Sequence, residues 1–495
     1  MEVAASPPSA TMPCSSAARV VVQNYQHALS MIFAIDEVNK NARFLPNVTL
    51  GYKIYDNLFD SMGTYETITD LLFTGQRDGF NYDSVSKKDA LSVIGGLTEE
   101  YAIQMANVLN IYKIPQLTYT AYETTLNSKV PFPSLYRMAP KETTLHMGIV
   151  QLLLYFNWRW IGLIVSDNDD GERFVQILTP MLVQNFICVA YLHRARSLNN
   201  YFLNDYMKDV PKINATIVSA EINVIIVSGD SQSLFSLTFV LVLNEFETKT
   251  PLGKVWITPP QWDFTQAKSL AGFCTETFQG ALSFSLHTNE VPGFRNFLQT
   301  LKSNEALMHF LCLFWQFAFK CRLPNGNLEN FQECTGEERL ENLPESWFEM
   351  DMTGQSYSIY NAVYAVAHAL QEIHLSKQRT LVDRSRSHFL NVQPWQLHSF
   401  LKNAHFNNGA GHEFFFQNGE ISAGYDIINW VTFSNQSFHK VWVGKISPRE
   451  ECIINGDIIL WNSRFKQMQI IVSSAQKTNI QARTMTNVSP SFKPS

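Results

Sequence analysis

Residues 90–120 contain two short apolar runs separated by a segment of helical periodicity. A short apolar run, Leu91 to Ile94, ends at the pair Gly95-Gly96, and a second apolar run opens at Ile114. Between the two runs, one helical stripe is formed by Ala102, Met105, Ala106 and Leu109. A strand, a helix and a strand in this order predict a βαβ unit with parallel strands and a right-handed crossover.

Polar residues follow both predicted strands of this unit. Thr98 and Glu99 come after the first strand, and Thr120, Ala121 and Tyr122 come after the second. In an open parallel sheet the ligand crevice lies beyond the carboxyl ends of the strands. We therefore expect these two loops to meet at one ligand-binding site.

The alternation of strands and helices continues towards the C-terminus. Five further runs of strand character are Trp160 to Ser166, Ile187 to Leu192, Val224 to Ser228, Lys254 to Thr258 and Ala281 to Leu286. Val48 to Tyr55 also alternates as a strand, and an Asn418-Gly419 turn between alternating flanks predicts a hairpin. This order predicts an α/β fold with two doubly wound, mostly parallel sheets, joined near Asn157 and near Thr288.

Length and composition place the chain among globular proteins of more than one domain. Its 495 residues are too many for one hydrophobic core, so two or three domains are expected. Hydrophobic residues make up 45% and charged residues 17%, and the net charge is −6 without a basic block, which gives no reason to expect a nucleic-acid partner. The longest apolar runs are shorter than the ~20 residues that span a bilayer, and the N-terminus is not a convincing signal peptide.

Cysteines and glycosylation sequons bear on the cellular compartment. The seven cysteines are few for this length, and N-x-[ST] sequons occur at Asn47, Asn214, Asn435 and Asn487. Together with Cys321 and Cys334, which flank a short loop rich in Pro, Gly and Asn, the sequons favour an oxidising, secretory compartment. The N-terminus argues against it, so composition leaves the compartment open.

Four motifs suggest chemistry, and each lacks a residue that the chemistry needs. Gly229 to Ser233 resembles the nucleophile elbow of a hydrolase, but a serine stands where the closing glycine is required. Asp167 to Glu172 puts glycine at the fifth rather than the sixth position of a calcium loop, so a helix N-terminus that accepts acidic residues explains it better. His412-Glu413 lacks the second histidine of a zinc helix, and Gly95-Gly96 lacks the third glycine of a dinucleotide fingerprint. We therefore expect no metal, no cofactor and no enzymatic activity, and a site suited to reversible binding.

Several separated segments, in one order along the chain, carry a family resemblance. They include FLPNVTLGYKIYDN, IYKIPQLTY, LYFNWRWIGLIVSD, EVPGFRNFL, SYSIYNAVYAVAHALQE and GYDIINW, and they run from about Tyr25 to Phe465. These segments resemble the extracellular ligand-binding domain of class C G-protein-coupled receptors. The likeness is greatest to the vomeronasal type 2 pheromone receptors and extends to the calcium-sensing branch. The resemblance implies a bilobed Venus flytrap fold, like that of periplasmic binding proteins.

The resemblance implies that the chain passes between two lobes three times. Lobe 1 would comprise residues 25–157 and 288–406, and lobe 2 would comprise residues 158–287 and 407–447. The remaining parts would be an atypical N-terminus over 1–24, a linker towards an absent Cys-rich domain over 448–470, and a disordered, divergent tail over 471–495. On this interpretation the chain is a receptor fragment, a splice form or an incomplete gene model. The family match also implies a disulfide between Cys321 and Cys334.

The resemblance implies a receptor function as well. A peptide or small-molecule chemosignal would bind between the lobes and favour their closure. A homodimer or heterodimer formed through lobe 1 would pass this change to a seven-helix domain that couples to a G protein. The implied location is the extracellular side of the plasma membrane. The alternative is a soluble extracellular binding protein or decoy on the same fold.

The implied ligand site departs from that of the amino-acid-sensing relatives. Glu99 and Tyr122 stand where those relatives carry hydroxyl side chains, Asp170 replaces a tyrosine, and Pro260, which precedes Gln261, replaces an acidic residue.

Glu142 keeps the acidic side chain that the resemblance implies at its position in the site. Glu99 would repel the carboxylate of a free amino acid, and a low local dielectric would strengthen that repulsion. Peptide or protein chemosignals are therefore the better expectation.

Overall fold

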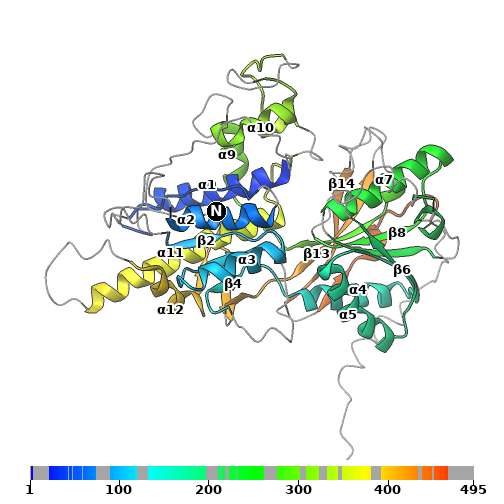
Figure 1. Ribbon diagram of the computed structural model, residues 1–495, viewed down its shortest axis with the longest axis horizontal. Helices are drawn as coiled ribbons and strands as arrows, with labels where there is room; N and C mark the ends of the chain where they lie inside the picture. Colours follow the sequence, from blue (N-terminus) through cyan, green and yellow to red (C-terminus); the bar gives the residue numbers. More distant parts are fainter. Residues whose placement is uncertain are drawn as a thin grey trace, which may run out of the picture.

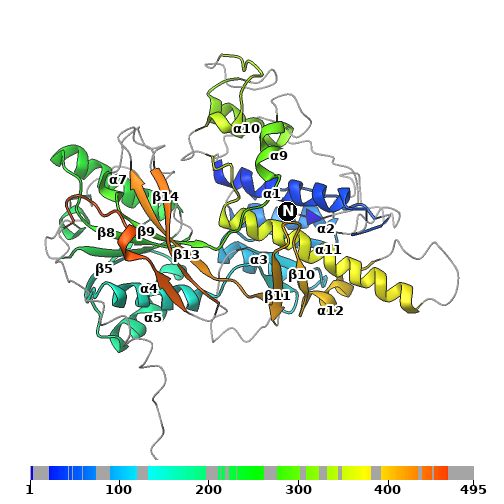
Figure 2. The ribbon, with the colours of Figure 1, turned by 180° about the vertical axis from the view of Figure 1, so that it is seen from behind.

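The computed structural model shows two α/β bodies side by side, each built on its own sheet (Figures 1 and 2). We call them lobe 1 and lobe 2. The predicted fold class, α/β with two mostly parallel sheets, is confirmed. The structure describes residues 2–3, 22–42, 44–46, 48–57, 60–73, 90–119, 132–196, 210–211, 213–217, 222–229, 231–260, 276–301, 308–322, 332–343, 348–380, 392–417, 419–432, 438–448 and 451–465.

Lobe 1 contains the sheet to which both strands of the predicted βαβ unit belong. Its described strands are, in spatial order, β1 (Glu2–Val3), β2 (Ser92–Ile94), β3 (Gln116–Thr118), β4 (Leu135–Arg137), β12 (Glu420–Ile421), β11 (Glu413–Gln417) and β10 (His405–Asn407). β2, β3, β4 and β12 run parallel to one another, as a βαβ unit requires, while β1, β11 and β10 add antiparallel edges.

Helices cover both faces of the lobe 1 sheet (Figure 1). α1 (Val22–Lys40) packs against α11 (Gly354–Thr380) in the larger core, and α2 (Ser61–Phe73) packs with α3 (Glu99–Leu109) over a smaller one. Successive side chains of a strand point to opposite faces, so Ile94 of β2 joins the larger core and Val93 joins the smaller. The other described helices of this lobe are α9 (Phe294–Thr300), α10 (Met308–Phe319), α12 (His398–Leu401) and short 3-10 turns at Leu340–Asn342 and Pro394–Leu397.

Lobe 2 contains the longer strands that the apolar runs predict. In spatial order they are β15 (Cys452–Ile454), β14 (Phe438–Ile446), β13 (Tyr425–Thr432), β9 (Leu282–Leu286), β8 (Val255–Thr258), β7 (Val224–Ser228), β5 (Trp160–Ser166) and β6 (Cys188–Ala195). The five strands from β9 to β6 are parallel, and β13, β14 and β15 extend the sheet antiparallel.

Helices also cover both faces of the lobe 2 sheet. α4 (Glu142–Tyr155) and α5 (Asp169–Gln184) lie on one face and α7 (Ser231–Thr248) on the other, with 3-10 turns at Glu276–Phe278 and Gly456–Ile458. Along β5, Leu163 and Val165 point into the core with α4 and α5, whereas Ile164 points to the opposite core. No helix in the described part of the chain has an apolar stretch long enough to cross a bilayer.

The first passage between the lobes comes earlier than predicted. Met138 packs in the lobe 1 core, and its neighbour Ala139 already packs in the lobe 2 core. α4, which was predicted to end lobe 1, buries Leu145 and Ile149 in lobe 2. The predicted boundary between residues 157 and 158 is therefore wrong. An amphipathic stripe shows that one helix face is buried but does not show which sheet covers it.

The last passage comes later than predicted. β10, β11 and β12 complete the lobe 1 sheet, so residues 407–421 belong to lobe 1 and not to lobe 2. Ile421 lies in the lobe 1 core and Tyr425 in the lobe 2 core, which places the passage between them. Residues 451–465 of the predicted linker also belong to lobe 2. β15 pairs with β14, and Ile459 is buried in the lobe 2 core.

The predicted strand at Val48 to Tyr55 is wrong. In the structure this segment has one isolated bridge residue and no strand. The Asn39 side chain of α1 binds its backbone instead, donating to the Leu50 carbonyl (2.9 Å) and accepting from the Leu50 N–H (2.8 Å). A side-chain amide thus takes the place of a neighbouring strand, while the alternating apolar residues still face the lobe 1 core.

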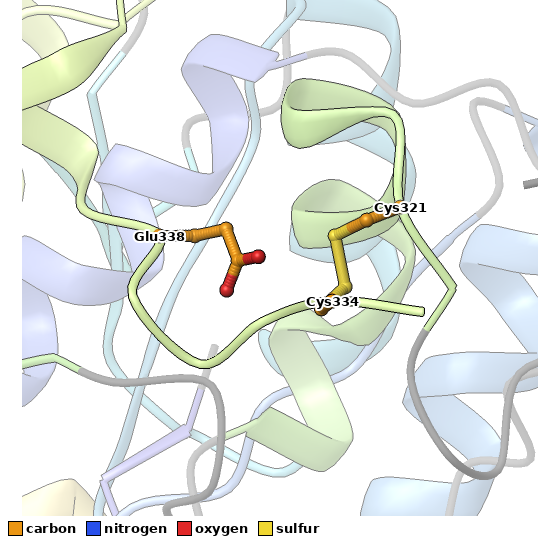
Figure 3. Close-up of side chains that lie close together, drawn as sticks. All are labelled: Cys321, Cys334 and Glu338. Atoms are coloured by element: carbon orange, nitrogen blue, oxygen red, sulfur yellow. A yellow bond between two sulfur atoms is a disulfide. The ribbon is translucent and has the colours of Figure 1, made fainter. Parts of the chain in front are cut away.

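A disulfide joins Cys321, after α10, to Cys334 (Figure 3). Glu338 lies beside it and accepts hydrogen bonds from the backbone N–H groups of Thr335 (2.6 Å) and Gly336 (2.8 Å). These three side chains are spaced like metal ligands. Because the two sulfur atoms are bonded to each other, neither is a thiolate ligand, and the group is assigned a structural role.

One buried histidine makes lobe 1 sensitive to acid. His27 on α1 is buried with its ring edge-on to Tyr119, and burial lowers the pKa of His27 from 6.5 to about 4. The folded state therefore holds this proton less tightly than the unfolded state, so stability present above pH 6.5 is lost as the pH falls towards 4.

We expect acidification from pH 7 to pH 5 to lower the free energy of unfolding by about 2 kcal/mol through His27. Urea unfolding of the wild type and His27→Leu at both pH values measures this loss. Between pH 7 and pH 5, the free energy of unfolding of His27→Leu should fall by about 2 kcal/mol less than that of the wild type. Equal acid sensitivity in the two proteins would contradict the assignment.

Candidate ligand-binding site

The start of α3 brings the first predicted site residues to the carboxyl edge of the lobe 1 sheet. Thr98 is the N-cap, and its side chain accepts a hydrogen bond from the Tyr101 N–H (3.4 Å). Gly96 turns the backbone there with a φ of 95°, and the Thr118 hydroxyl at the end of β3 donates to its carbonyl (3.1 Å). The ends of β2 and β3 therefore meet, as the parallel pairing predicts, and Glu99 opens the helix beside them.

The start of α5 forms the facing edge in lobe 2. Asn168 is the N-cap and accepts a hydrogen bond from the Gly171 N–H (3.0 Å), while the Ser166 hydroxyl donates to the same Asn168 oxygen (2.6 Å). Asp170 lies in the acidic first turn, where the helix dipole favours negative charge. The interpretation of this loop as a helix N-terminus is confirmed.

An ion pair joins these two helix starts across the lobes. Arg173 Nη1 of α5 donates to Glu99 Oε1 of α3 (2.8 Å), and Arg173 Nη2 contacts both Glu99 Oε2 and Asp170 Oδ1, the latter at 2.7 Å. The pair is well enclosed, with the Glu99 side chain 9% and the Arg173 side chain 17% exposed. Two parallel N–H to oxygen contacts between a guanidinium and a carboxylate give a directional, charge-assisted pair. We call Glu99, Glu142, Asp170 and Arg173 the interlobe site.

The electrostatics of the interlobe site are dominated by burial and by excess negative charge. Burial raises the pKa of Glu99; Arg173 lowers it, and the carboxylates of Asp170 and Glu142 raise it further. The two contacts with the Arg173 guanidinium favour the ionised carboxylate. Burial tends to lower the pKa of Arg173, but the same three carboxylates hold it above its ordinary value. One guanidinium therefore compensates the buried Glu99 carboxylate only in part.

Glu142 and His146 complete the lobe 2 side of the site, one turn apart on α4. His146 Nε2 lies 3.9 Å from Glu142 Oε1, and its side chain is fully buried. Burial lowers the pKa of His146 to about 4. A hydrogen bond with the Glu142 backbone acts in the opposite direction, and the charge of Arg173 lowers this pKa further. The imidazole is therefore neutral near pH 7.

A second ion pair joins the lobes. Lys440 on β14 contacts the Glu349 carboxylate of the lobe 1 segment that precedes α11, and its ammonium lies 5.1 Å from the centre of the Trp430 ring. Near the passage after β9, a separate cavity of about 440 Å³ is lined by Thr288, Asn289, Glu290, Val291, Phe294, Arg295, Asp351 and Met352. This cavity contains none of the predicted ligand-binding residues.

Sequence comparison identifies the family of this chain. Residues 26–432 match the family described as the receptor family ligand binding region. The chain belongs to this family. It therefore is a receptor ligand-binding region, and its relatives are class C G-protein-coupled receptors, which confirms the predicted resemblance.

Three relatives illustrate the range of this similarity. Vomeronasal type-2 receptor 26 of Mus musculus is 30% identical over 464 residues, covering 92% of this chain and 53% of the relative. Extracellular calcium-sensing receptor of Homo sapiens is 25% identical over 474 residues, covering 88% of this chain and 43% of the relative. Taste receptor type 1 member 2 of Gorilla gorilla gorilla is 28% identical over 439 residues, covering 85% of this chain and 47% of the relative. The chain spans about half the length of these curated relatives.

The structure of this ligand-binding region brings four of the predicted site residues to one place. Thr98 caps the helix that Glu99 opens, and Glu142 and Asp170 lie within electrostatic range of Glu99. Pro260 is half-buried two residues after β8, and no hydrogen bond or ion pair joins the two sites in the part of the chain that the structure describes, so its predicted role stays a prediction. Predicted positions that lie outside the described residues are Thr120, Ala121, Tyr122 and Gln261.

The glycosylation sites of the ligand-binding region stay predictions. Asn47, Asn435 and Asn487 lie outside the described residues. Asn214 lies in a helical stretch over 213–217 with its Oδ1 atom buried, so a glycan there would require the side chain to turn outwards.

Arg173, the residue at the centre of the site, was not predicted from the sequence. A local signal for it exists in the chain, because Arg173 follows the acidic first turn of α5 and forms an i,i+3 ion pair with Asp170. This local pair does not reveal the second partner of Arg173. The partner Glu99 lies 74 residues away and in the other lobe, so its identity required the fold.

Proposed function

We propose that this receptor ligand-binding region takes a peptide or protein chemosignal between its lobes and responds by a change in lobe closure. The observation that carries this proposal is the Glu99–Arg173 pair, which joins the lobes at the carboxyl edges of their parallel strands. Ligands of open α/β sheets bind at such edges. In the proposed receptor, closure passes to a seven-helix membrane domain that couples to a G protein, with the ligand-binding region on the extracellular side.

Two interlobe ion pairs support closure as the response. Glu99–Arg173 and Glu349–Lys440 both form only when the lobes approach each other. A ligand shifts the equilibrium between open and closed lobes by its difference in affinity for the two states. A ligand that contacts the interlobe site would touch both lobes at once, and it would therefore have such a difference.

An exposed apolar face of lobe 1 supports a dimer. Met62 and Tyr65 on α2, and Ile111 and Tyr112 directly after α3, are large apolar side chains exposed to solvent. Large apolar side chains exposed on neighbouring elements are frequent in protein–protein contacts, and homodimers commonly pair one such surface with its copy. We propose this α2–α3 face as the lobe 1 contact.

We expect the interlobe site to reject free α-amino acids. A ligand carboxylate near Glu99 would face a buried carboxylate whose charge Arg173 already compensates only in part. Thermal unfolding of the chain with millimolar glutamate or phenylalanine tests this. A ligand present at 100 times its dissociation constant would raise stability by ~2.7 kcal/mol, and we expect no such rise in the wild type.

Glu99→Ser is the matched comparison, because it removes the buried carboxylate and restores a hydroxyl at that position. Stabilisation of the wild type by a free amino acid would contradict the peptide or protein assignment. Synthetic peptides screened in the same assay supply the positive test of the proposed function.

A further inference from the structure

We infer that the interlobe site is a receptor for a cationic group, and that Arg173 occupies it as an internal stand-in. A ligand would bring a guanidinium or ammonium group that binds Glu99 in place of Arg173. This inference rests on the proposed ligand-binding function and names the chemical class of the group that the site recognises.

The balance of charge at the interlobe site favours an added cation. Three carboxylates, those of Glu99, Glu142 and Asp170, act on one guanidinium, that of Arg173. With all four groups ionised, the site carries three negative charges and one positive charge. At short range and with little water, an added cation is attracted and an added anion is repelled.

The geometry of the bound Arg173 guanidinium also fits a site for a cation. Arg173 reaches Glu99 from the opposite lobe, so Glu99 already coordinates a cation that comes from outside its own lobe. Arg173 Nε is buried and has no hydrogen-bond partner among the described residues. The guanidinium thus uses its donors incompletely, and a mobile cation can adopt a geometry that the tethered side chain does not reach.

The imidazole next to the carboxylates adds no positive charge to the site. His146 is fully buried with its Nε2 3.9 Å from Glu142 Oε1, and burial lowers its pKa, so the ring is neutral near pH 7. Within the interlobe site the carboxylates therefore have only the Arg173 guanidinium to compensate them. An ammonium or guanidinium that binds near Glu142 would supply a second positive charge, whereas a carboxylate ligand would not.

These features also explain which ligands the site would exclude. The amine of a free amino acid could approach Glu99, but its carboxylate would then lie near Asp170 or Glu142. In a peptide, a basic side chain or the N-terminal amine lies far from the C-terminal carboxylate. A peptide can therefore satisfy the site without bringing a second negative charge.

Chemical rescue of Arg173→Ala tests the inference on the full chain. The probe is methylguanidinium chloride at 20 mM, with methylurea as its neutral analogue and sodium chloride to match the ionic strength. We expect methylguanidinium to raise the melting temperature of Arg173→Ala by about 2 °C or more relative to methylurea. The wild type, in which Arg173 occupies the site, and Glu99→Gln/Arg173→Ala, which lacks the carboxylate, should show no such difference.

Two results would overturn the inference: no selective rescue of a folded Arg173→Ala, or equal stabilisation of all three proteins. If Arg173→Ala does not fold, Arg173→Gln, which keeps the length and polarity of the side chain, replaces it with the same expectations. Failure here is distinguishable from failure of the proposed function. A chain that binds peptides in the thermal assay but shows no cation rescue keeps its function and loses the cationic assignment.

Discussion

Replacing Arg173 with methionine should lower the free energy of unfolding by about 3 kcal/mol, because the substitution leaves the buried Glu99 carboxylate without its partner. Removing both charges in Glu99→Gln/Arg173→Met should cost about 1 kcal/mol, since no uncompensated charge then remains. Urea unfolding of the wild type, both single variants and the double variant gives the coupling energy between the two side chains.

The matched control is another arginine–carboxylate pair. Arg295 Nη2 lies 2.9 Å from Asp351 Oδ2, but the two side chains are 57% and 74% exposed, respectively. Exposed pairs contribute about 0–1 kcal/mol, so Arg295→Met should have a small effect. A loss for Arg173→Met no larger than that of Arg295→Met would show that the interlobe pair is not enclosed as described.

Gly171→Ala should also cost about 3 kcal/mol, at the upper end of the range for overpacking. Gly171 lies in the first turn of α5, where a Cβ atom would stand 2.0 Å from the Ser166 backbone carbonyl oxygen at the end of β5. Backbone cannot move aside as a flexible side chain can, so the helix start and the strand end must separate. The measurement is urea unfolding of the wild type and the variant.

Asp169→Ala is the control for Gly171→Ala, because Asp169 lies in the same turn and is exposed. Its loss removes a favourable interaction with the helix dipole of up to about 1 kcal/mol. Equal effects of the two substitutions would contradict the close approach of α5 to β5. A further consequence of Gly171→Ala is a displaced Arg173, so weaker Glu99–Arg173 coupling is expected in that background.

The sequence predicted those parts of the site that local patterns encode. Thr98 and the acidic turn at Asp170 could be recognised because helix N-termini prefer short polar caps and acidic residues. The approach of the ends of β2 and β3 followed from the parallel pairing of a βαβ unit.

Other parts could not be read from local patterns. The lobe boundaries were misplaced because α4 and β11 have buried faces that would suit either sheet, and only the assembled sheets decide between them. Arg173 was missed because its partner is contributed by the other lobe. Long-range pairs of this kind depend on how the two lobes approach each other, which no local window of sequence contains.

We propose that the Glu99–Arg173 pair holds the two lobes of this receptor ligand-binding region together. Small-angle X-ray scattering of the wild type and of Arg173→Met, at neutral pH and low salt, tests it most directly. We predict a wild-type profile that fits the lobes in contact and a larger radius of gyration for Arg173→Met, because the lobes separate when the pair is lost. An unchanged radius of gyration in a folded Arg173→Met would contradict the claim.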